Sequence, residues 1–401
     1  MIKKFSSSHK SSKNKDLTNP QNITPIETGS FPVPPKQKQI AAHGQRRFHI
    51  WPRSWSTKKK RIFTALLVVV LILLIGGGAY AYKKTHSAKT TVTVKKTTAT
   101  VVKPTTEPSK LTGIKVAPEM NQRTVTGVMI ENSPDARPQS GLLDAGVVYE
   151  AVAEGGITRF LALFQEAQPS YIGPIRSSRP YYLDWLLPFN ATYAHVGGSP
   201  EALAQIKSLK VKDLDQFANA GAYQRVTQRY APHNVYSSID QLYKLAESKG
   251  YTNGTFTGFG RKEEAPTKVA PTAKTIDFAI SSALYNPHYD YDAATNSYKR
   301  SEGGKIHTDE KTGTQLSPKV VIALVTPSAL ESDGTHNSYA TTGTGKMYVF
   351  QDGTVTEGTW TKDSRTSQFV FKDSTGAVLK LNPGQTWISL VNTAGSVTSK
   401  P

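Results

Sequence analysis

The strongest apolar stretch of the chain lies near its N-terminus, at "IFTALLVVVLILLIGGGAYAY", residues 62–82. A helix needs about 20 predominantly apolar residues to cross a hydrocarbon core of roughly 30 Å, and this run is uncharged throughout. A cleaved signal peptide has a shorter apolar region and does not follow a long polar segment. We therefore predict a single transmembrane helix over 62–82, rather than a signal peptide or a buried soluble helix.

Basic residues dominate the chain before this helix. Lys58, Lys59, Lys60 and Arg61 directly precede it, and the positive-inside rule then places the N-terminus in the cytoplasm and everything after about residue 83 outside. Residues 1–61 are polar with little apolar periodicity, which predicts a disordered basic cytoplasmic tail.

The Thr-, Lys- and Pro-rich segment 83–124 follows the apolar run. Its composition predicts an extended stalk that carries a folded part away from the membrane.

From about residue 125 the pattern becomes that of a globular protein. Short runs rich in β-branched and aromatic residues predict strands, and Gly155-Gly156 between two of them predicts a hairpin turn. Helical spacing of apolar residues, with Ser199 as an N-cap and Gly250 as a stop, predicts two helices. The predicted strands are 126–132, 145–154, 157–165 and 191–198, and the predicted helices are 199–209 and 237–250.

These elements predict a mixed-sheet domain of the α/β or α+β class over 125–255. A Gly-, Lys- and Pro-rich join follows, and beyond it the alternating runs and turn signals such as "QDGT" and "DSTG" are typical of hairpins. We therefore predict a second, smaller, mostly β domain over 270–396.

The net charge of +19 is unevenly distributed. Residues 1–61 carry 14 Lys and Arg against 2 acidic residues, 62–125 carry 9 against 2, and 126–401 carry 26 of each sign. The predicted folded part therefore lacks the basic excess of a nucleic-acid-binding protein. The absence of cysteine excludes disulfides, thiolate nucleophiles, zinc–thiolate sites and a lipid-modified cysteine.

Arginines close to aromatic residues form the main candidate site. Arg176 and Arg179 lie in "GPIRSSRPYYLDW", and Arg159 lies across the Gly-Gly turn from Glu154. Since Arg grips phosphate or carboxylate through a planar fork, the group predicts an anion-binding site. A set of structural Arg–carboxylate pairs is the alternative. If Arg179 is extended, as Pro180 favours, the side chains of Arg176 and Arg179 diverge.

A second candidate for anion binding is Gly197-Gly198-Ser199, at the start of the predicted helix 199–209. Exposed N–H groups at a helix start attract anions, although a plain capped helix explains the motif equally well. Arg229 in "RYAPHNVY" is a further candidate ligand-binding residue.

Histidines give weaker signals. His195 and His233 are candidate general bases, but neither belongs to a nucleophile motif, and a structural role fits each better. His307 and Asp309 in "GGKIHTDEKTG" form a conceivable metal pair, although a polar hairpin explains them better, and we predict no metal site.

Several motifs in order resemble one family. "MIENSPDARPQSGLLDAGVVYEAVAEGGITRFLALF", "IGPIRSSRPYYLDW", "GGSPEAL", "APHNVY", "YKRSEGGKIHTD", "GTGKMYVFQDGTVTEGTW" and "LNPGQTWI" are similar to the YerB-like bacterial lipoproteins, a two-part domain of unknown function. The resemblance covers about 125–395 and implies an envelope-associated, two-domain protein of no established activity. Because this chain has no cysteine, residues 62–82 would replace the lipid anchor.

Two main functions and one lesser alternative follow as hypotheses. The first is a binding or scaffold module for a cell-wall polymer, an anionic ligand or an envelope partner protein. The alternative rests on architectural likeness to the LytR–CpsA–Psr phosphotransferases, and it is phosphoryl or glycosyl transfer on a lipid-linked wall precursor. There the arginines would neutralise a pyrophosphate, and Asp144 or Glu154 would hold a divalent cation such as magnesium or act as a base. A hydrolase using His195 or His233 is a third possibility.

Overall fold

The computed structural model describes residues 55–85 and 105–401, without the side chains of 78–85. The predictions for residues 1–54 and 86–104, which form most of the cytoplasmic tail and half of the stalk, lie outside the described residues.

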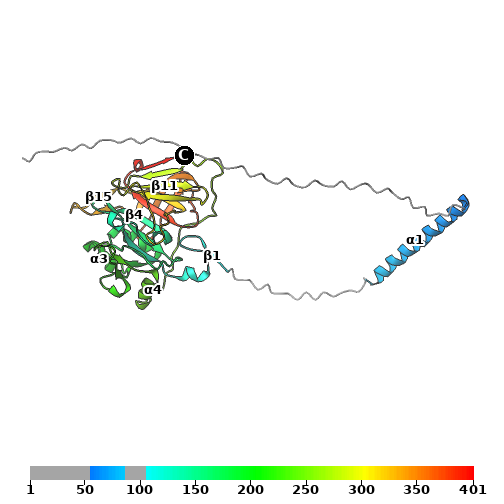
Figure 1. The fold of residues 1–401 in the computed structure, drawn as a ribbon, viewed down its shortest axis with the longest axis horizontal. Helices are drawn as coiled ribbons and strands as arrows, with labels where there is room; N and C mark the ends of the chain where they lie inside the picture. Colours follow the sequence, from blue (N-terminus) through cyan, green and yellow to red (C-terminus); the bar gives the residue numbers. More distant parts are fainter. Residues whose placement is uncertain (1–54, 86–104) are drawn as a thin grey trace, which may run out of the picture. The chain divides into compact units, whose positions relative to one another are not determined.

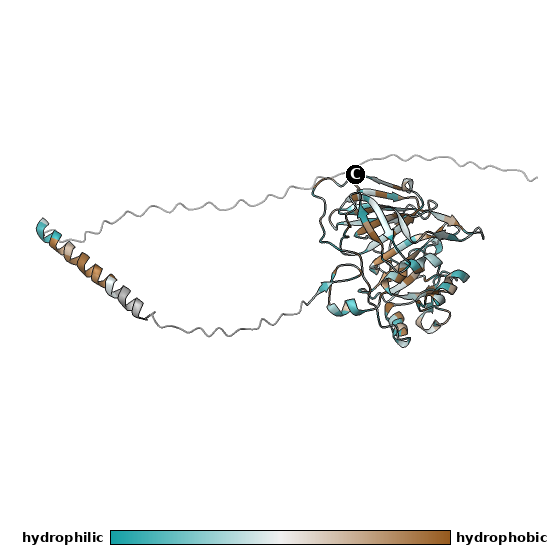
Figure 2. Ribbon diagram, turned by 180° about the vertical axis from the view of Figure 1, so that it is seen from behind, coloured by the Kyte–Doolittle hydropathy of each residue, from teal (hydrophilic) through white to brown (hydrophobic). Residues whose placement is uncertain are grey.

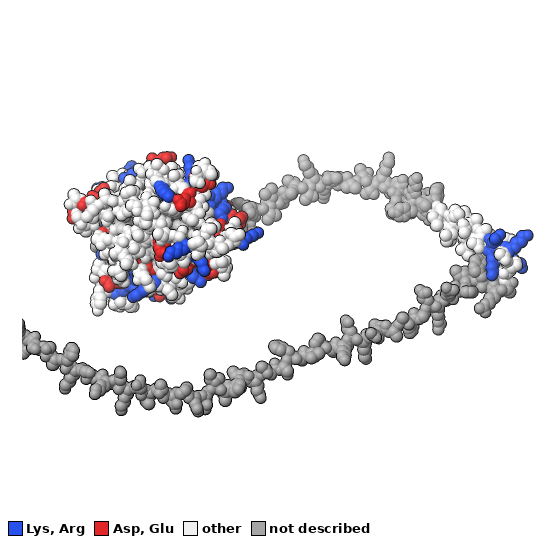
Figure 3. Space-filling view, turned by 90° about the horizontal axis from the view of Figure 1, so that it is seen from above, with Lys and Arg blue, Asp and Glu red and all other residues white. Residues whose placement is uncertain are grey.

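The first of two compact units, Met1–Thr98, contains one described helix, α1, Thr57–Thr85 (Figure 1). Its window Thr57–Gly77 is long and apolar enough to cross a membrane, and none of that window is buried. Figure 2 shows the apolar turns of the helix, and Figure 3 shows basic side chains gathered at one of its ends. The predicted apolar helix is therefore present, while its insertion into a membrane stays a prediction.

The second unit, Ala99–Pro401, is built on a mixed ten-stranded sheet of order β19-β18-β17-β14-β20-β4-β5-β3-β6-β7. Its strands in chain order are β3 (Thr126–Glu131), β4 (Val147–Glu154), β5 (Ile157–Phe164), β6 (Thr192–Ala194), β7 (Lys212–Asp213), β14 (Val320–Val325), β17 (Gly343–Gln351), β18 (Thr354–Lys362), β19 (Val370–Asp373) and β20 (Thr386–Val391). The predicted mixed sheet is thus confirmed. The segments 125–255 and 270–396 each contribute five strands, and β20 pairs in parallel with β4. The predicted boundary therefore does not coincide with a break in the sheet.

The hairpin β4–β5 lies inside this sheet, and its residues are almost entirely buried. Gly155 and Gly156 both have positive φ, 56° and 76°, as a two-residue hairpin turn requires. Alternate residues face two different hydrophobic clusters, with Leu161 in one and Phe160 in the other. Both faces of the sheet are covered, which explains why the strands read as nearly continuous apolar runs.

Helices cover the two faces. The predicted helices are confirmed as α3 (Pro200–Ser208), capped by Ser199, and α4 (Ile239–Ser248), capped by Ser238. A third helix, α2 (Pro180–Leu186), buries its aromatic residues in the first cluster, whereas α4 packs in the second.

A five-stranded antiparallel sheet packs against part of the main sheet. Its order is β13-β12-β11-β10-β21, and its strands are β10 (Thr275–Phe278), β11 (Pro287–Asp292), β12 (Ser297–Glu302), β13 (Lys305–Ile306) and β21 (Val397–Lys400). A third hydrophobic cluster joins Ile276 and Tyr289 of this sheet to Val321 and Phe350 of the main sheet. Short two-stranded sheets complete the unit as β1 (Glu107–Pro108) with β2 (Lys115–Val116), β8 (Gln224–Arg225) with β9 (Val235–Tyr236), and β15 (Ser328–Leu330) with β16 (Asn337–Tyr339).

The stalk prediction is wrong for residues 105–124. Leu111 is fully buried in the first hydrophobic cluster, and Ser109 and Thr112 are buried with it. The backbone N–H groups of Leu111 and Thr112 both donate to the Ser109 hydroxyl. Composition alone did not predict this folded turn, because a single buried apolar residue such as Leu111 is enough to attach a Thr- and Pro-rich segment to the core.

Candidate functional site

Charged residues meet at one edge of the main sheet, where three neighbouring strands end or begin. Glu131 ends β3 and lies opposite Arg159 of β5, while Glu154 ends β4. Arg176 and Arg179 reach the same edge from the loop before α2, as their ion pairs show. We call these five residues the arginine cluster.

Two arginines hold the Glu154 carboxylate between them. Arg159 Nη2 contacts Glu154 Oε1, and Arg179 Nη2 lies 2.7 Å from Glu154 Oε2. Each guanidinium also donates to a backbone carbonyl, Arg159 to Ser177 and Arg179 to Ser178. Burial tends to raise the pKa of Glu154, but the charges of Arg159 and Arg179 outweigh it and hold the pKa below its ordinary value.

The third arginine approaches the second carboxylate. Arg176 Nε lies 3.3 Å from Glu131 Oε1, and the charge of Arg176 also acts on Glu154. His233 Nδ1 lies 2.9 Å from the same Glu131 oxygen, and the Ser133 hydroxyl donates to it over 3.0 Å. Arg176 is 26% exposed, so this end of the cluster is open to solvent.

Unpartnered polar atoms concentrate in the cluster. Over the described residues, twelve buried side-chain nitrogens and oxygens lack a hydrogen-bond partner, and five belong here, namely Glu131 Oε2, Glu154 Oε2, Arg159 Nε, Arg176 Nε and Arg179 Nε. Arg176 Nε and Glu154 Oε2 have ion-pair contacts, but these lack hydrogen-bond geometry. Buried polar groups are rarely left unpaired in native proteins, so these atoms are candidate contacts for a water molecule or a ligand.

The helix-start motif has a structural explanation. The Ser199 hydroxyl accepts from the N–H of Ala202, and the Gly197 N–H donates to Asp215 over 2.8 Å. Gly198 pairs with Ser178 beside the arginine cluster. The Gly197 N–H is therefore already occupied by a carboxylate of the chain itself.

His195 is also held in place by neighbouring groups. Its ring is fully buried, with Nε2 2.9 Å from Asp213 Oδ1 and Nδ1 2.8 Å from the Gly197 carbonyl. Both ring nitrogens have partners, so a structural role explains His195.

Asp144 and Arg229 lie outside the arginine cluster. Asp144 precedes β4 and Glu154 ends it, so the length of this eight-residue strand, roughly 25 Å, separates the two residues. Burial and the nearby Asp309 raise the pKa of Asp144. Arg229 donates to the carbonyls of Asp135 and Pro138 and so holds the loop that follows β3.

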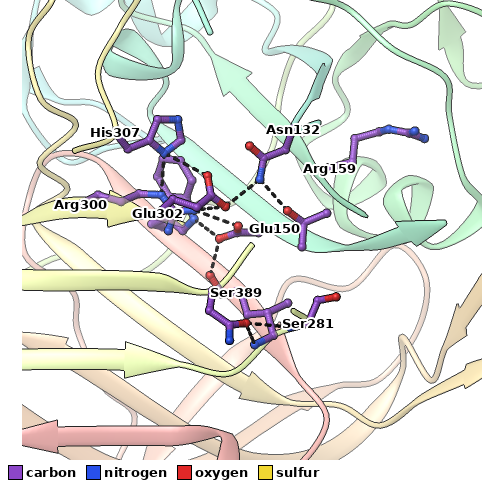
Figure 4. A network of polar contacts seen from close by, with 12 residues as sticks. Asn132, Glu150, Arg159, Ser281, Arg300, Glu302, His307 and Ser389 are labelled. Carbon is purple, nitrogen blue, oxygen red and sulfur yellow. Dashed lines mark hydrogen bonds and ion pairs between the residues drawn. The ribbon is translucent and has the colours of Figure 1, made fainter. Parts of the chain in front are cut away.

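A second polar network, buried beside the first, contains Arg300 and Glu302, which the sequence analysis did not identify (Figure 4). Arg300 and Glu150 form a fully buried ion pair of 2.9 Å. The other Glu150 oxygen accepts from Trp387 Nε1 and the Ser389 hydroxyl. The guanidinium of Arg300 lies 4.4 Å from the Trp387 ring centroid. The pair therefore joins β12 to β4 and β20, and thus the smaller sheet to the larger one.

Glu302 extends this network to the loop after β3. Its Oε1 accepts from Asn132 Nδ2 over 2.7 Å and lies 3.2 Å from Arg300. Burial raises the pKa of Glu302 to about 7, with Glu150 adding to the rise and Arg300 opposing it. His307 has a pKa well below its ordinary value, because it is buried beside Arg300 and Arg137.

Alternation along β12 was the signal that could have found these residues. Tyr298, Arg300 and Glu302 are spaced by two, so they share one strand face, and all three are buried. Asn132 links the two polar groups, since its amide donates to both Glu302 and Thr158, next to Arg159. In Figure 4 the Arg159 side chain points away from the Glu302 network, so the two sites are adjacent but separate.

Comparisons with known proteins match most of the second unit. Residues 111–252 match the family described as "Protein of unknown function (DUF3048) N-terminal domain", and residues 276–388 match its C-terminal domain. A protein of Bacillus subtilis (strain 168) named "Putative lipoprotein YerB" is 34% identical over 286 residues, which is 70% of this chain and 85% of the relative.

A crystal structure of YerB protein from Bacillus subtilis has the same fold. It matches with a TM-score of 0.66 and 30% identity, over 73% of this chain and 99% of the crystallised chain. All three hydrophobic clusters that the structure describes lie within Ala99–Pro401, so we expect this unit to fold without the residues before it.

Proposed function

We propose that this chain, which belongs to the YerB family, is a membrane-anchored envelope protein that binds an anionic ligand at the arginine cluster. The two parts of that family are the N- and C-terminal domains of a protein of unknown function (DUF3048). The observation that carries the proposal is the meeting of three guanidinium groups with only two carboxylates, at a place where all three Nε atoms lack hydrogen-bond partners.

An anion suits this arrangement for electrostatic reasons. Arg159, Arg176 and Arg179 exceed Glu131 and Glu154 by one positive charge. Guanidinium groups bind phosphate and carboxylate through paired N–H donors, and such charge-assisted hydrogen bonds are stronger than neutral ones. The partly exposed Arg176 offers an entry point, while the buried Arg159 and Arg179 provide a rigid base. A phosphate or pyrophosphate group fits these donors.

Two features support binding over group transfer. Both Glu154 oxygens contact arginines, and the lowered pKa of this carboxylate makes it a weak base. Asp144, the other acidic residue that the transfer hypothesis uses, lies at the opposite end of β4. Neither carboxylate is therefore placed to activate a nucleophile at the arginines.

The proposed anchor is α1. The name of the Bacillus relative refers to a lipoprotein, but this chain has no cysteine to carry a lipid. Basic residues in the first turns of α1, ahead of its apolar run, and none within that run favour an extracytoplasmic folded unit. Protease added to intact cells should digest the folded unit. If the unit were protected in intact cells and digested only in lysed cells, the proposed orientation would be contradicted.

Titration calorimetry of the unit Ala99–Pro401 with inorganic pyrophosphate tests the binding proposal. Loss of one charge-assisted contact costs about 1.5–3 kcal/mol, so we expect Arg176→Ala to raise the dissociation constant roughly 10- to 100-fold. Arg123→Ala is the matched control. It also removes one arginine charge, but Arg123 precedes the first residue of β3, whereas the arginine cluster lies at the last residue of that strand. Equal affinities of wild type and Arg176→Ala would overturn the proposal.

A further inference from the structure

A pocket of about 320 Å³ opens next to the Glu302 network, and the anion-binding proposal does not involve it. Its lining includes two exposed aliphatic side chains, Leu284 (55% exposed) and Ile306 (64% exposed). Pro134, Pro138 and Glu302 line it as well. A pocket with apolar walls and a few polar groups is the usual form of a small-molecule site.

The carboxylate of Glu302 is half satisfied. Its side chain is 1% exposed, and Oε1 has the partners Asn132 and Arg300. Oε2 has no hydrogen-bond partner among the described residues. It lies 3.6 Å from Arg137 Nη2 and 3.5 Å from His307 Nδ1. An unpaired buried carboxylate oxygen is costly, and a donor in the pocket would remove that cost.

None of the neighbouring side chains described forms a hydrogen bond with this oxygen. His307 Nδ1 accepts from Arg300 Nε over 3.0 Å, and His307 Nε2 then donates to Gln139 Oε1 over 2.8 Å. Arg137 donates to Asn132 and to the carbonyl of Leu284. Arg137 keeps a second N–H on Nη2, but that nitrogen lies 3.6 Å from Oε2, so Oε2 has ion-pair contacts only and can accept from a bound molecule.

The charges around Glu302 favour an uncharged donor. Arg300 and Arg137 already balance Glu150 and Glu302, so a ligand cation would add an unbalanced charge in a desolvated place. We propose that this pocket binds a neutral, hydroxyl-bearing ligand of the size of one sugar ring, which donates a hydroxyl to Glu302 Oε2 and rests its C–H surface on Leu284 and Ile306.

Size and shape support a saccharide unit over a peptide. The volume is about ten times that of a liquid water molecule, which suits a ligand with about ten non-hydrogen atoms. The strand at the rim, β13 (Lys305–Ile306), has only two residues and offers too short an edge for a peptide strand. A hydroxyl can also both donate and accept, so it suits Glu302 in either protonation state.

A protein-observed NMR titration of Ala99–Pro401 with D-glucose tests the proposal, with acetamide and methylammonium as comparison probes. We expect glucose to shift the backbone amides of Gly303 and Ile306, and an excess of pyrophosphate to leave these shifts in place. Ile306→Ala should weaken glucose binding at least fivefold. Leu330→Ala is the matched control, since Leu330 is similarly exposed but does not line the pocket, and its affinity should not change.

Glu302→Leu removes both oxygens and should abolish glucose binding. Circular dichroism checks its folding, and Ile306→Ala carries the test if Glu302→Leu unfolds. Absence of shifts at the pocket, equal affinity of Ile306→Ala and wild type, or binding of methylammonium or acetamide in preference to glucose would each overturn the proposal. None of these results depends on pyrophosphate binding at the arginine cluster.

Discussion

The ion pair of Glu150 and Arg300 is the most deeply buried charge pair described in the protein. Both side chains are fully buried, and each has further partners, with Trp387 and Ser389 bonding to Glu150 and Tyr289 accepting from Arg300. Such a pair contributes little net stability compared with apolar residues of the same shape, but removal of one member leaves a buried charge uncompensated. We infer that the pair fixes how the two sheets pack.

Removal of one partner should therefore be severe. We expect Glu150→Gln to lower the free energy of unfolding by about 3–5 kcal/mol, measured by urea denaturation of Ala99–Pro401. The exposed pair Lys346–Glu357 serves as control, and Glu357→Gln should cost less than about 1 kcal/mol. Similar losses in both variants would show that the buried pair has no special role.

Glu302 should give stability a characteristic pH dependence. Its folded pKa of about 7 lies above the ordinary value of 4.5, so between these pH values the folded protein binds more protons than the unfolded chain. The free energy of unfolding therefore falls as pH rises from about 4.5 to about 7, and the contribution is constant above that window.

Glu302→Gln removes this titration. We expect the stability of wild type relative to Glu302→Gln to fall by roughly 1–3 kcal/mol across the window, in urea denaturation at several pH values. A difference that does not change with pH would contradict the raised pKa.

The sequence predicted part of the arginine cluster at the scale of residues. Glu154 and Arg159 flank a Gly-Gly turn, so their proximity follows from local pairing. Arg176 and Arg179 reach them through long-range contacts, such as the Glu131 N–H donating to the Pro174 carbonyl. Arg179 is extended, as Pro180 favours, yet both arginines reach the cluster. The local sequence pattern carries no information on contacts between residues that are distant in the sequence.

At the scale of elements, the hairpin β4–β5 positions Glu154 and Arg159 by its turn. Gly155 has a φ of 56°, and a side chain built there would meet nothing within 4 Å. Glycine is therefore favoured at this position because it adopts a positive φ, and not because space is short. Strand and helix periodicities predicted this hairpin, α3 and α4 well, because each has its own turn or cap residues.

Substitution at the turn isolates this effect. We expect Gly155→Ala to lower the free energy of unfolding by about 1 kcal/mol, since a left-handed conformation is unfavourable for alanine. Gly155→Asn should cost less, because asparagine adopts that conformation more readily. Differential scanning calorimetry of the two variants checks the order, and an equal cost would point to steric rather than conformational strain.

At the scale of the whole molecule, the main sheet crosses the two family segments. β20 lies between β14 and β4, although residues 386 and 147 are distant in the sequence. Periodicity identifies strands but not their order, so the sequence predicted two successive domains and not a shared sheet. Acidic and basic side chains are interspersed on the surface in Figure 3, in keeping with the balanced charge of residues 126–401.

Separate segments should therefore be unstable. We expect residues 105–255 alone to lack dispersed NMR signals, because β4 would expose the edge that β20 covers. The segment 270–401 should behave likewise, and mixing the two should restore a folded spectrum. A well-dispersed spectrum of either segment alone would show that each forms an independent domain.

Anion binding at the arginine cluster should change the environment of its three guanidinium groups. The most direct test is ¹H–¹⁵N NMR of the Nε–H groups of Arg159, Arg176 and Arg179, which have no hydrogen-bond partner in the described structure. Addition of inorganic pyrophosphate to Ala99–Pro401 should shift all three signals together, while that of Arg123 stays in place. Three unchanged signals at millimolar pyrophosphate, in a protein that remains folded, would contradict the account.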